Sequence, residues 1–473
     1  MSKQHSVMIA MTGASLLGGC VSLAPDYDPV APPVPADLHD IDLKENTAEL
    51  LQWQSVFTAP QLQSLIDTAL TQNRSLRAVA ANVRAARAQY GITGSARWPS
   101  LAVGGSVREG ETFEEDATAT AQGTFSDGSA LNVGLSSYEL DFFGRVANLS
   151  EAALQSWLSS VEGERATKIL LVSSVADAWI SLASNKRLLL LAEETAQSQM
   201  SSLELTQRRF NSGVANELDI HRASSSVHTA RAEAARLKAV VSQNLNTLRL
   251  LVGAPLPEDV LETANLEFAP TTENLPFAQS SSILLNRPDV IAAERTLLAA
   301  NANIGAARAA FFPSISLTGT IGYASADLNN LVDVTSGGWS LGPSISLPIF
   351  DGGRRKSALN VSKAQQEAAL ANYEYAIQSA FKETADALAV ADTIEERLDA
   401  LNALAEDNQA TLDLSNERFS AGIDSYLPVL DAQRNNYSAQ QLLIATQRDK
   451  ALNAVSVFRA LGGWPETTIN AGS

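Results

Sequence analysis

The chain has 473 residues, with 52 acidic against 34 basic side chains, a formal net charge of −18 and a single cysteine. This acidic balance argues against a nucleic-acid partner, and one cysteine excludes intrachain disulfides and cysteine-rich zinc sites. The sequence shows no Ser-His-Asp arrangement and no phosphate-binding glycine loop, so we expect no enzyme, no metal and no cofactor other than a covalent lipid.

The first residues have the pattern of a bacterial lipoprotein signal. The apolar run Val7 to Leu17 is too short for a mature membrane helix and ends in Leu17-Gly18-Gly19-Cys20. Residues 1–19 are therefore a predicted signal peptide, and Cys20 is the predicted lipidation site, carrying palmitate; an ordinary buried cysteine is the alternative. Residues 20–50 contain five prolines between Pro25 and Pro35 and form a predicted tether. Val21, in place of an aspartate, favours sorting to the outer membrane.

The body of the chain is an internal repeat with a spacing of about 210 residues. The segment ARAQYGITGSARWPSLAVGG at 86–105 corresponds to ANANIGAARAAFFPSISLTG at 300–319, and LLVGAP ending at Pro255 corresponds to ALGGWP ending at Pro465. We assign residues 51–255 and 286–465 to two copies of one unit, each beginning with a helix. Residues 256–285 join them and residues 466–473 form a tail. Two copies of one unit predict pseudo-symmetry and a closed object.

Four segments alternate apolar and small polar residues, as β-strands do: 99–108, 131–142, 313–324 and 338–350. Aromatic residues stand at the strand ends nearest the helices, as in an interfacial girdle, so we expect the apolar faces to contact lipid; these residues are Trp98, Phe142, Phe143, Phe311, Phe312 and Phe350. Four strands cannot close a barrel, whereas three copies would supply twelve. The pattern therefore predicts a homotrimer.

Two further segments, 145–253 and 354–462, are predicted helical hairpins of coiled-coil length. No proline lies between Pro99 and Pro255 or between Pro348 and Pro428, which permits helices of about 100 Å at 1.5 Å per residue. Steps of seven residues from Val161 and from Leu370 give almost entirely apolar rows. Gly213 and Gly422 suit the left-handed residue that ends a helix, and they mark the predicted tips.

Several motifs resemble the TolC-like outer-membrane factors, in particular the NodT-like efflux lipoproteins. The resemblance covers essentially the whole chain, and its motifs are QWQSVFTAPQLQSLIDTALTQN at 52–73, NRPDVIAAERTLLAANANIGAARAAFFPSISL at 286–317, LPIFDGGRR ending at 355 and YLPVLDAQRNNY at 426–437. It implies a trimer with a twelve-stranded outer-membrane β-barrel, a twelve-helix barrel in the periplasm and an equatorial belt between them.

The resemblance also implies a function. The chain would be the passive exit duct of a tripartite efflux system, anchored by lipid in the outer membrane and extending into the periplasm. Its partners would be a periplasmic adaptor, docking at the tips around Gly213 and Gly422, and an inner-membrane pump of the resistance-nodulation-division type. The substrates would be small molecules, including antibiotics.

By the same resemblance, Leu427 and Asp431 would narrow the periplasmic aperture, and Arg434 lies on the same helix face as Asp431. Glu217, Asp219 and Arg222 occupy the comparable place in the first repeat. From spacing alone, solvated helix charges are the favoured interpretation of the charged residues in these two groups. The motif favours the gate instead for Leu427 and Asp431 and leaves the first-repeat group open.

Two alternative functions remain at this point. A type I protein-secretion duct would share the sequence pattern. A lipid-anchored coiled-coil scaffold would instead use the hairpin strands as a small soluble domain, and it would dissolve without detergent once its lipid was removed.

Overall fold

The computed structural model describes residues 22–27, 33–35, 52–109, 128–264, 281–325, 328–332 and 337–463. The predicted signal peptide, Cys20, most of the tether, residues 265–280 and the tail lie outside these ranges. The chain divides into two compact units, which we describe separately. Unit 1 comprises residues 1–30, 83–160 and 292–373, and unit 2 comprises residues 31–82, 161–291 and 374–473.

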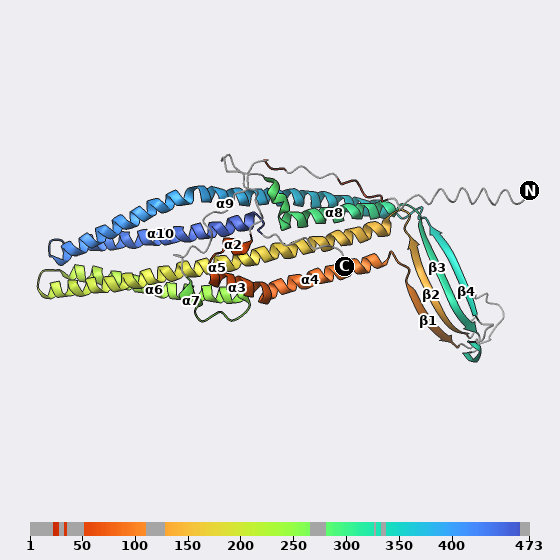
Figure 1. Ribbon diagram of the computed structural model, residues 1–473, viewed down its shortest axis with the longest axis horizontal. Coiled ribbons are helices and arrows are strands. Elements are labelled where there is room, and N and C mark those ends of the chain that lie inside the picture. Colours follow the sequence, from red (N-terminus) through yellow and green to blue (C-terminus); the bar gives the residue numbers. More distant parts are fainter. Residues whose placement is uncertain are drawn as a thin grey trace, which may run out of the picture. The chain divides into compact units, whose positions relative to one another are not determined.

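Unit 1 contains one antiparallel sheet of four strands in the order β1-β2-β3-β4 (Figure 1). The strands are β1 (Leu101–Arg108), β2 (Gly128–Leu140), β3 (Ser314–Ser325) and β4 (Gly337–Ser346). The β1–β2 and β3–β4 hairpins come from the two repeats, and the β2–β3 ladder joins the repeats into one sheet. The predicted two hairpins are thus confirmed as halves of a single sheet.

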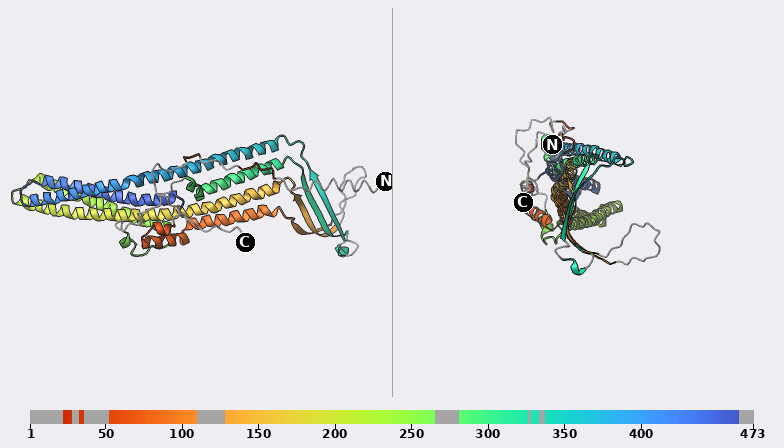
Figure 2. Two further views of the ribbon diagram at one scale, coloured as in Figure 1. Left: turned by 45° about the horizontal axis from the view of Figure 1, so that its top comes forward. Right: turned by 90° about the vertical axis from the view of Figure 1, so that its right-hand side faces the viewer.

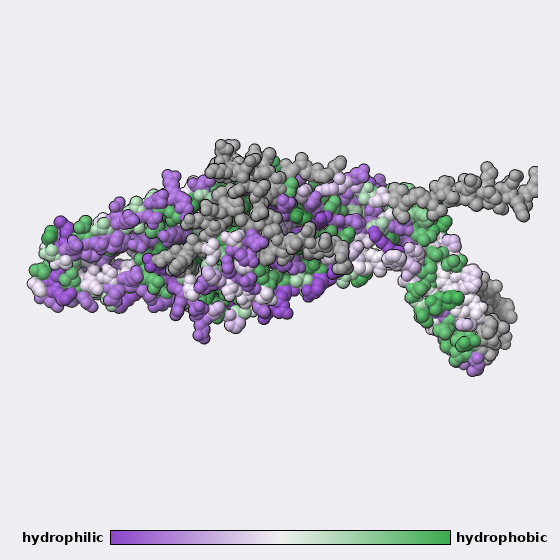
Figure 3. Space-filling view, in the orientation of Figure 1, coloured by the Kyte–Doolittle hydropathy of each residue, from purple (hydrophilic) through white to green (hydrophobic). Residues whose placement is uncertain are grey.

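The strand register places large apolar side chains on one face of the sheet and small or polar side chains on the other. Val103, Val133, Ile321 and Trp339 lie level across all four strands, and the other large apolar residues follow in steps of two except at the β2 irregularity between Leu135 and Tyr138. The opposite face carries small or polar residues such as Thr320 and Ser340. Nothing within the described residues covers the apolar face: Val103 and Trp339 are 75% and 76% exposed. Figure 3 shows this face as an apolar surface along the strands.

The strand bounds differ from the prediction by two or more residues in β1, β2 and β4, and by one residue at each end of β3. β2 begins at Gly128 and ends at Leu140, because Gly144, with φ of 72°, turns the chain into the next helix. β4 ends at Ser346, four residues before Phe350, since Pro348 has no N–H for the ladder. β1 begins at Leu101, just after Pro99.

Helix segments next to the sheet complete unit 1. α4 (Arg74–Ser95) and α5 (Arg145–Asn211) meet where Tyr90 stacks on Trp157 with 5.9 Å between ring centroids. α5 also meets α8 (Pro288–Ala309), where the Ser159 hydroxyl donates to the carbonyl oxygen of Ala292. Beside the strand ends, Phe143 stacks on Phe312 at 4.7 Å. Aromatic contacts thus mark the junction between helices and strands.

Unit 2 contains the helical hairpins. α5 continues into it and turns back as α6 (Glu217–Val252), while α9 (Arg354–Ser420) turns back as α10 (Tyr426–Ala460). The two hairpins lie side by side with their tips at the same end in both Figure 1 and Figure 2. One stretch of α5 is long and apolar enough to cross a membrane, but 56% of it is buried within the chain, so we interpret it as a core helix.

The largest apolar core of unit 2 lies where short helices cover the hairpin bases. α2 (Trp53–Val56) and α3 (Pro60–Gln72) pack against α5, α6 and α10. Phe57 meets Phe458 edge-on at 5.3 Å, and both side chains are fully buried. Two shorter elements, α7 (Val260–Thr263) and the 3-10 helix η1 (Ser281–Asn286), belong to the linking segment, and η2 (Leu328–Asn330) lies in the β3–β4 connection.

The two heptad rows behave differently at the tips. In α9 every member of the row from Leu370 to Phe419 is buried or half-buried. In α5 the row holds until Leu203, but its last member, Phe210, is 38% exposed, whereas the corresponding Phe419 is 4% exposed. The two copies therefore share the helical hairpin but differ in how the phenylalanine at the tip is packed.

Candidate channel gate and docking tips

Both hairpin tips use the same backbone device. Gly213 and Gly422 have φ of 76° and 77°, the left-handed conformation that glycine adopts without a Cβ clash. The N–H of Val214 donates to the carbonyl oxygen of Arg209, and that of Ile423 to Arg418, at 3.0 and 2.9 Å. These bonds close the last helix turn and reverse the chain. The side chains of Val214 and Ile423 are both 64% exposed, so each tip presents one aliphatic residue.

The predicted gate residues of the second repeat share one exposed face at the start of α10. Leu427, Asp431 and Arg434 follow a helical spacing of four and three and are all exposed. Tyr426, Val429 and Leu430 between them are buried and fix the helix against its neighbours. Within the described residues, neither Asp431 nor Arg434 takes part in an ion pair. The face is therefore free to meet other charged groups.

The first-repeat charges are engaged within their own helix. Glu217 lies 3.7 Å from His221, and Asp219 lies 3.9 Å from Arg222, both pairs within one turn of α6. The side chain of Asn216 accepts the backbone N–H of Asp219 and caps the helix start. These contacts are the ordinary ones of a solvated helix N-terminus, so the geometry brings no gate arrangement to Glu217 or Asp219.

One tip contact was not visible in the sequence. The Arg209 guanidinium at the end of α5 donates to the carbonyl oxygen of Phe419 at 2.5 Å and lies 4.7 Å from the centroid of the Phe419 ring. Phe419 in turn packs against Tyr426, whose pKa is raised by burial. Arg209 and Phe419 are 210 residues apart in the chain, and no local sequence pattern pairs them. This contact ties the two hairpins together beside the gate face.

Each hairpin also stabilises its own turn. In the second hairpin the Arg418 guanidinium donates to the Asp424 carboxylate at 2.6 Å across the turn, which lowers the pKa of Asp424. Behind the gate face, a cavity of about 610 Å³ separates α10 from α5 and α6 and is lined by Gln199, Glu233, Arg236, Arg434 and Tyr437. At its tip end α10 is therefore closely packed, whereas further along the helix a cavity separates it from α5 and α6.

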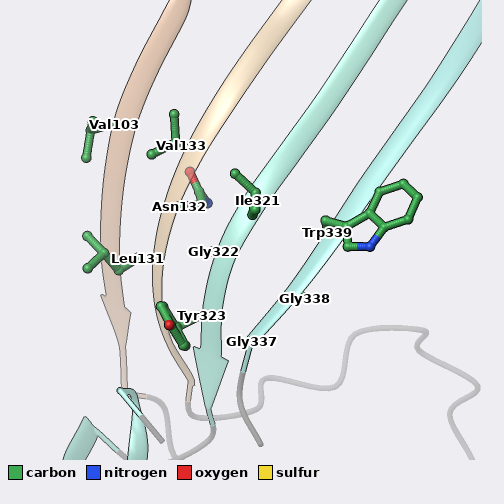
Figure 4. Close-up of a pocket in the computed structure, with 10 residues that line it drawn as sticks. All are labelled: Val103, Leu131, Asn132, Val133, Ile321, Gly322, Tyr323, Gly337, Gly338 and Trp339. Carbon is green, nitrogen blue, oxygen red and sulfur yellow. The ribbon is translucent and has the colours of Figure 1, made fainter. Parts of the chain in front are cut away.

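The exposed face of the sheet carries the second functional surface. A shallow hollow of about 550 Å³ is lined by Val103, Leu131, Val133, Ile321, Tyr323 and Trp339, together with three glycines and Asn132. Figure 4 shows the apolar side chains projecting from neighbouring strands into one open space. An open apolar surface of this kind, on a sheet with aromatic residues at its ends, suits contact with acyl chains.

A sheet with one uncovered apolar face, together with coiled-coil-length helical hairpins, defines a protomer of a channel-forming membrane protein. Comparisons with known proteins support this class. The model of the family "Outer membrane efflux protein" matches residues 65–254 and 280–463. The chain is 40% identical over 470 residues to "Probable efflux pump outer membrane protein TtgC" of Pseudomonas putida, covering 98% of this chain and 96% of the relative.

Two further comparisons extend this result. The chain is 39% identical over 459 residues to "Cation efflux system protein CusC" of Escherichia coli, covering 95% of this chain and 97% of the relative. The solved structure of the open state of the Neisseria gonorrhoeae MtrE outer membrane channel matches with a TM-score of 0.83 at 35% identity, covering 94% of this chain and 98% of that one.

The chain belongs to the outer membrane efflux protein family. It is an efflux channel protein of the outer membrane that extends into the periplasm, with a β-barrel and a helical barrel as its architecture. The resemblance seen in the sequence is confirmed. The alternative of a lipid-anchored coiled-coil scaffold is wrong, because the family model and the relatives are those of outer-membrane efflux channels.

Proposed function

We propose that three copies of this chain form the exit duct of a tripartite efflux assembly. The observation that carries the proposal is the open sheet: within the described residues, β1 and β4 are paired on one side only and form its two edges. Unpaired strand edges are costly in a membrane, where no water satisfies their N–H and C=O groups. Pairing β4 of one copy with β1 of the next three times closes twelve strands.

The gate of this duct is the exposed face of α10. A threefold axis near Leu427 and Asp431 would bring three aspartates together, and their mutual repulsion would be balanced by cations such as Arg434. Opening requires α10 to move away from that axis. The cavity between α10 and the α5–α6 hairpin lowers the number of packing contacts that such a movement breaks. A relative with a solved open state supports two states of the duct.

The exposed residues at the hairpin tips indicate the kind of partner that binds there. Val214 and Ile423 give each hairpin an exposed aliphatic residue beside Gly213 and Gly422, a surface suited to a periplasmic adaptor protein. The adaptor would link the duct to an inner-membrane pump of the resistance-nodulation-division type. Relatives named for efflux pumps and for cation efflux support small solutes over secreted proteins as cargo. Cys20 would carry the lipid anchor, and it lies outside the described residues.

The decisive experiment is single-channel recording of the purified full-length protein in planar bilayers. In the proposed trimer the Asp431 carboxylate would pair with cations such as Arg434 of a neighbouring copy. Asp431→Ala would remove these links between copies, so it should raise the open-state occupancy at least about fivefold. Asp407→Ala, which removes an exposed acid of α9, should leave conductance unchanged. If wild type and Asp431→Ala had the same conductance and open-state occupancy, the exposed face of α10 would not be the gate. If the protein formed no channel at all, the proposed duct would be wrong.

A further inference from the structure

The short segment after the lipidation site is bound to the body of unit 1 by specific contacts. Residues 22–27 lie along α8, where they are held by hydrogen bonds to side chains of that helix. The Asn301 amide donates to the carbonyl oxygen of Pro25 at 2.9 Å, and the Arg308 guanidinium donates to that of Leu23 at 3.0 Å. The Tyr27 hydroxyl donates to the Glu294 carboxylate at 3.1 Å.

These three contacts follow one rule. Glu294, Asn301 and Arg308 are seven residues apart on α8, so they lie on one face of the helix, about two turns from each other. Their partners Tyr27, Pro25 and Leu23 are two residues apart, as in an extended chain running antiparallel to the helix. Seven helix residues advance about 10.5 Å and two extended residues about 7 Å, so the long Tyr27 and Arg308 side chains span the difference at the two ends.

Gly305 provides the space for this strand. A Cβ at residue 305 would stand 2.8 Å from the backbone nitrogen of Ala24 and 2.8 Å from the Asn148 side chain. Glycine inside a helix costs roughly 1 kcal/mol relative to alanine, so its position is explained by the close approach of both the segment and the Asn148 side chain of α5. Asn148, at the start of α5, also accepts the hydroxyl of Ser22 at 3.0 Å.

The contacts connect three helices. Ser22 joins α5, Leu23 and Pro25 join α8, and Glu294 lies close to both Tyr27 and Tyr373 of α9, where burial together with the Glu294 charge raises the pKa of each tyrosine. Tyr373 is 6% exposed. Arg308 is in the last turn of α8 before β3, and Asn148 is in the first turn of α5 after β2. The segment therefore begins at the strand end of these helices.

We propose that residues 22–27 are a docking strap, which binds the groove Glu294-Asn301-Gly305-Arg308 and holds the acylated N-terminus beside the sheet. Cys20 is two residues from Ser22, which limits the lipid-bearing residue to about 7 Å from the start of the strap. The strap also braces α5 against α8, so the order of the sheet depends on it. The anchoring role rests on the proposed acylation of Cys20, whereas the docking does not.

Cross-linking tests the docking. In the full-length acylated protein, Pro25→Cys combined with Asn301→Cys should be joined efficiently by a short bis-maleimide. Pro25→Cys combined with Thr296→Cys is the matched control, because Thr296 lies on the face of α8 that contacts Ser159 of α5. We expect at least a fivefold higher yield for the first pair. Equal yields would overturn the strap.

Two glycine variants test the groove. Adding Gly305→Leu to the first pair should lower the yield at least fivefold, while Gly91→Leu, where a Cβ meets nothing within 4 Å, should not change it. Should Gly305→Leu fail to fold, Ser22→Ala with Tyr27→Phe removes two of the four bonds without altering the helices and should lower the yield about twofold. An unchanged yield in this double variant would contradict the proposal.

A third experiment distinguishes failure of the strap proposal from failure of the duct proposal. A Cys20→Ser chain exported with a cleavable signal should keep the cross-link, because no contact of the strap involves the lipid. In acylated Gly305→Leu the fraction of heat-resistant trimer should fall, while the trimers that remain should conduct as wild type does. Loss of conductance in all proteins would refute the duct alone, and an undiminished trimer fraction in Gly305→Leu would refute the brace.

Discussion

Arg287 is the strongest single polar anchor among the described residues of unit 2. Its side chain is 6% exposed and donates to the Asp289 and Glu383 carboxylates at 2.7 and 2.9 Å, and to the carbonyl oxygen of Ala460 at 2.9 Å. Gly462, with φ of 70°, leaves room for it, because a Cβ there would stand 2.9 Å from the arginine. One side chain thus fixes the start of α8, the middle of α9 and the end of α10.

Arg287→Ala should therefore destabilise the chain by about 3 kcal/mol, since it leaves two carboxylates and a helix-end carbonyl without their buried partner. Urea unfolding of the detergent-solubilised protein, followed by circular dichroism, measures the loss. Arg236→Ala removes an exposed pair with Glu233 and serves as control, with an unchanged midpoint. A similar, small effect of both substitutions would show that the buried arginine contributes no more than a surface one.

Asp177 gives the stability of unit 2 a defined pH dependence. Burial raises its pKa to about 6, and the charge of Arg459 offsets part of that rise. In the unfolded chain the pKa is about 3.9. The folded chain therefore binds the proton more tightly, so the ionised carboxylate costs stability above pH 6, and the cost disappears as the pH falls from about 6 to about 4.

Asp177→Asn should accordingly be more stable than wild type by about 2 kcal/mol at pH 8 and lose this advantage by pH 4. Urea midpoints of both proteins at several pH values give the difference directly. Asp67→Asn, which removes an exposed acid, should show no such trend. A difference that grows as the pH falls would contradict the assigned direction.

At the scale of elements, the sequence predicted what depends on local pattern. The alternation around Val103 and Trp339 gave the apolar sheet face, and the heptad row ending at Phe419 gave the buried seam of α9, because both follow from the period of one element. The strap on α8 and the bond from Arg209 to Phe419 were not predicted. Each joins residues more than 200 positions apart, and only packing brings them together.

Arg209 links the tips of the two hairpins through its hydrogen bond to the carbonyl oxygen of Phe419. Arg209→Gln removes the charge that lies over the Phe419 ring and weakens the bond to its carbonyl oxygen. Because this bond holds α9 beside α5, we expect two- to tenfold more frequent openings in planar bilayers. Arg208→Gln changes the exposed neighbouring arginine and should leave the opening frequency as in wild type. If Arg209→Gln closed the channel further, the contact would belong to the open state.

At the scale of the whole molecule, the charge of the chain determines which ions the duct conducts. The net charge of −18 is tripled in a trimer, whereas the polar face of the sheet carries neutral groups such as Thr320 and Ser340. The acid of that face, Glu139 of β2, is paired with Arg145, so most of the negative potential comes from outside the four strands, with Asp431 at the proposed narrowest point. Acidic rings favour cations because they concentrate them and repel anions.

A duct of this kind should prefer potassium over chloride, and a tenfold KCl gradient across a planar bilayer should give a reversal potential of the sign set by cations. Asp431→Asn should reduce that potential, because it removes three carboxylates from the constriction while leaving its size nearly unchanged. Asp407→Asn removes equal charge from α9 and should have the smaller effect. A reversal potential favouring chloride would mean that the acidic residues lie away from the conduction path, and the gate would then have to be sought on another helix face.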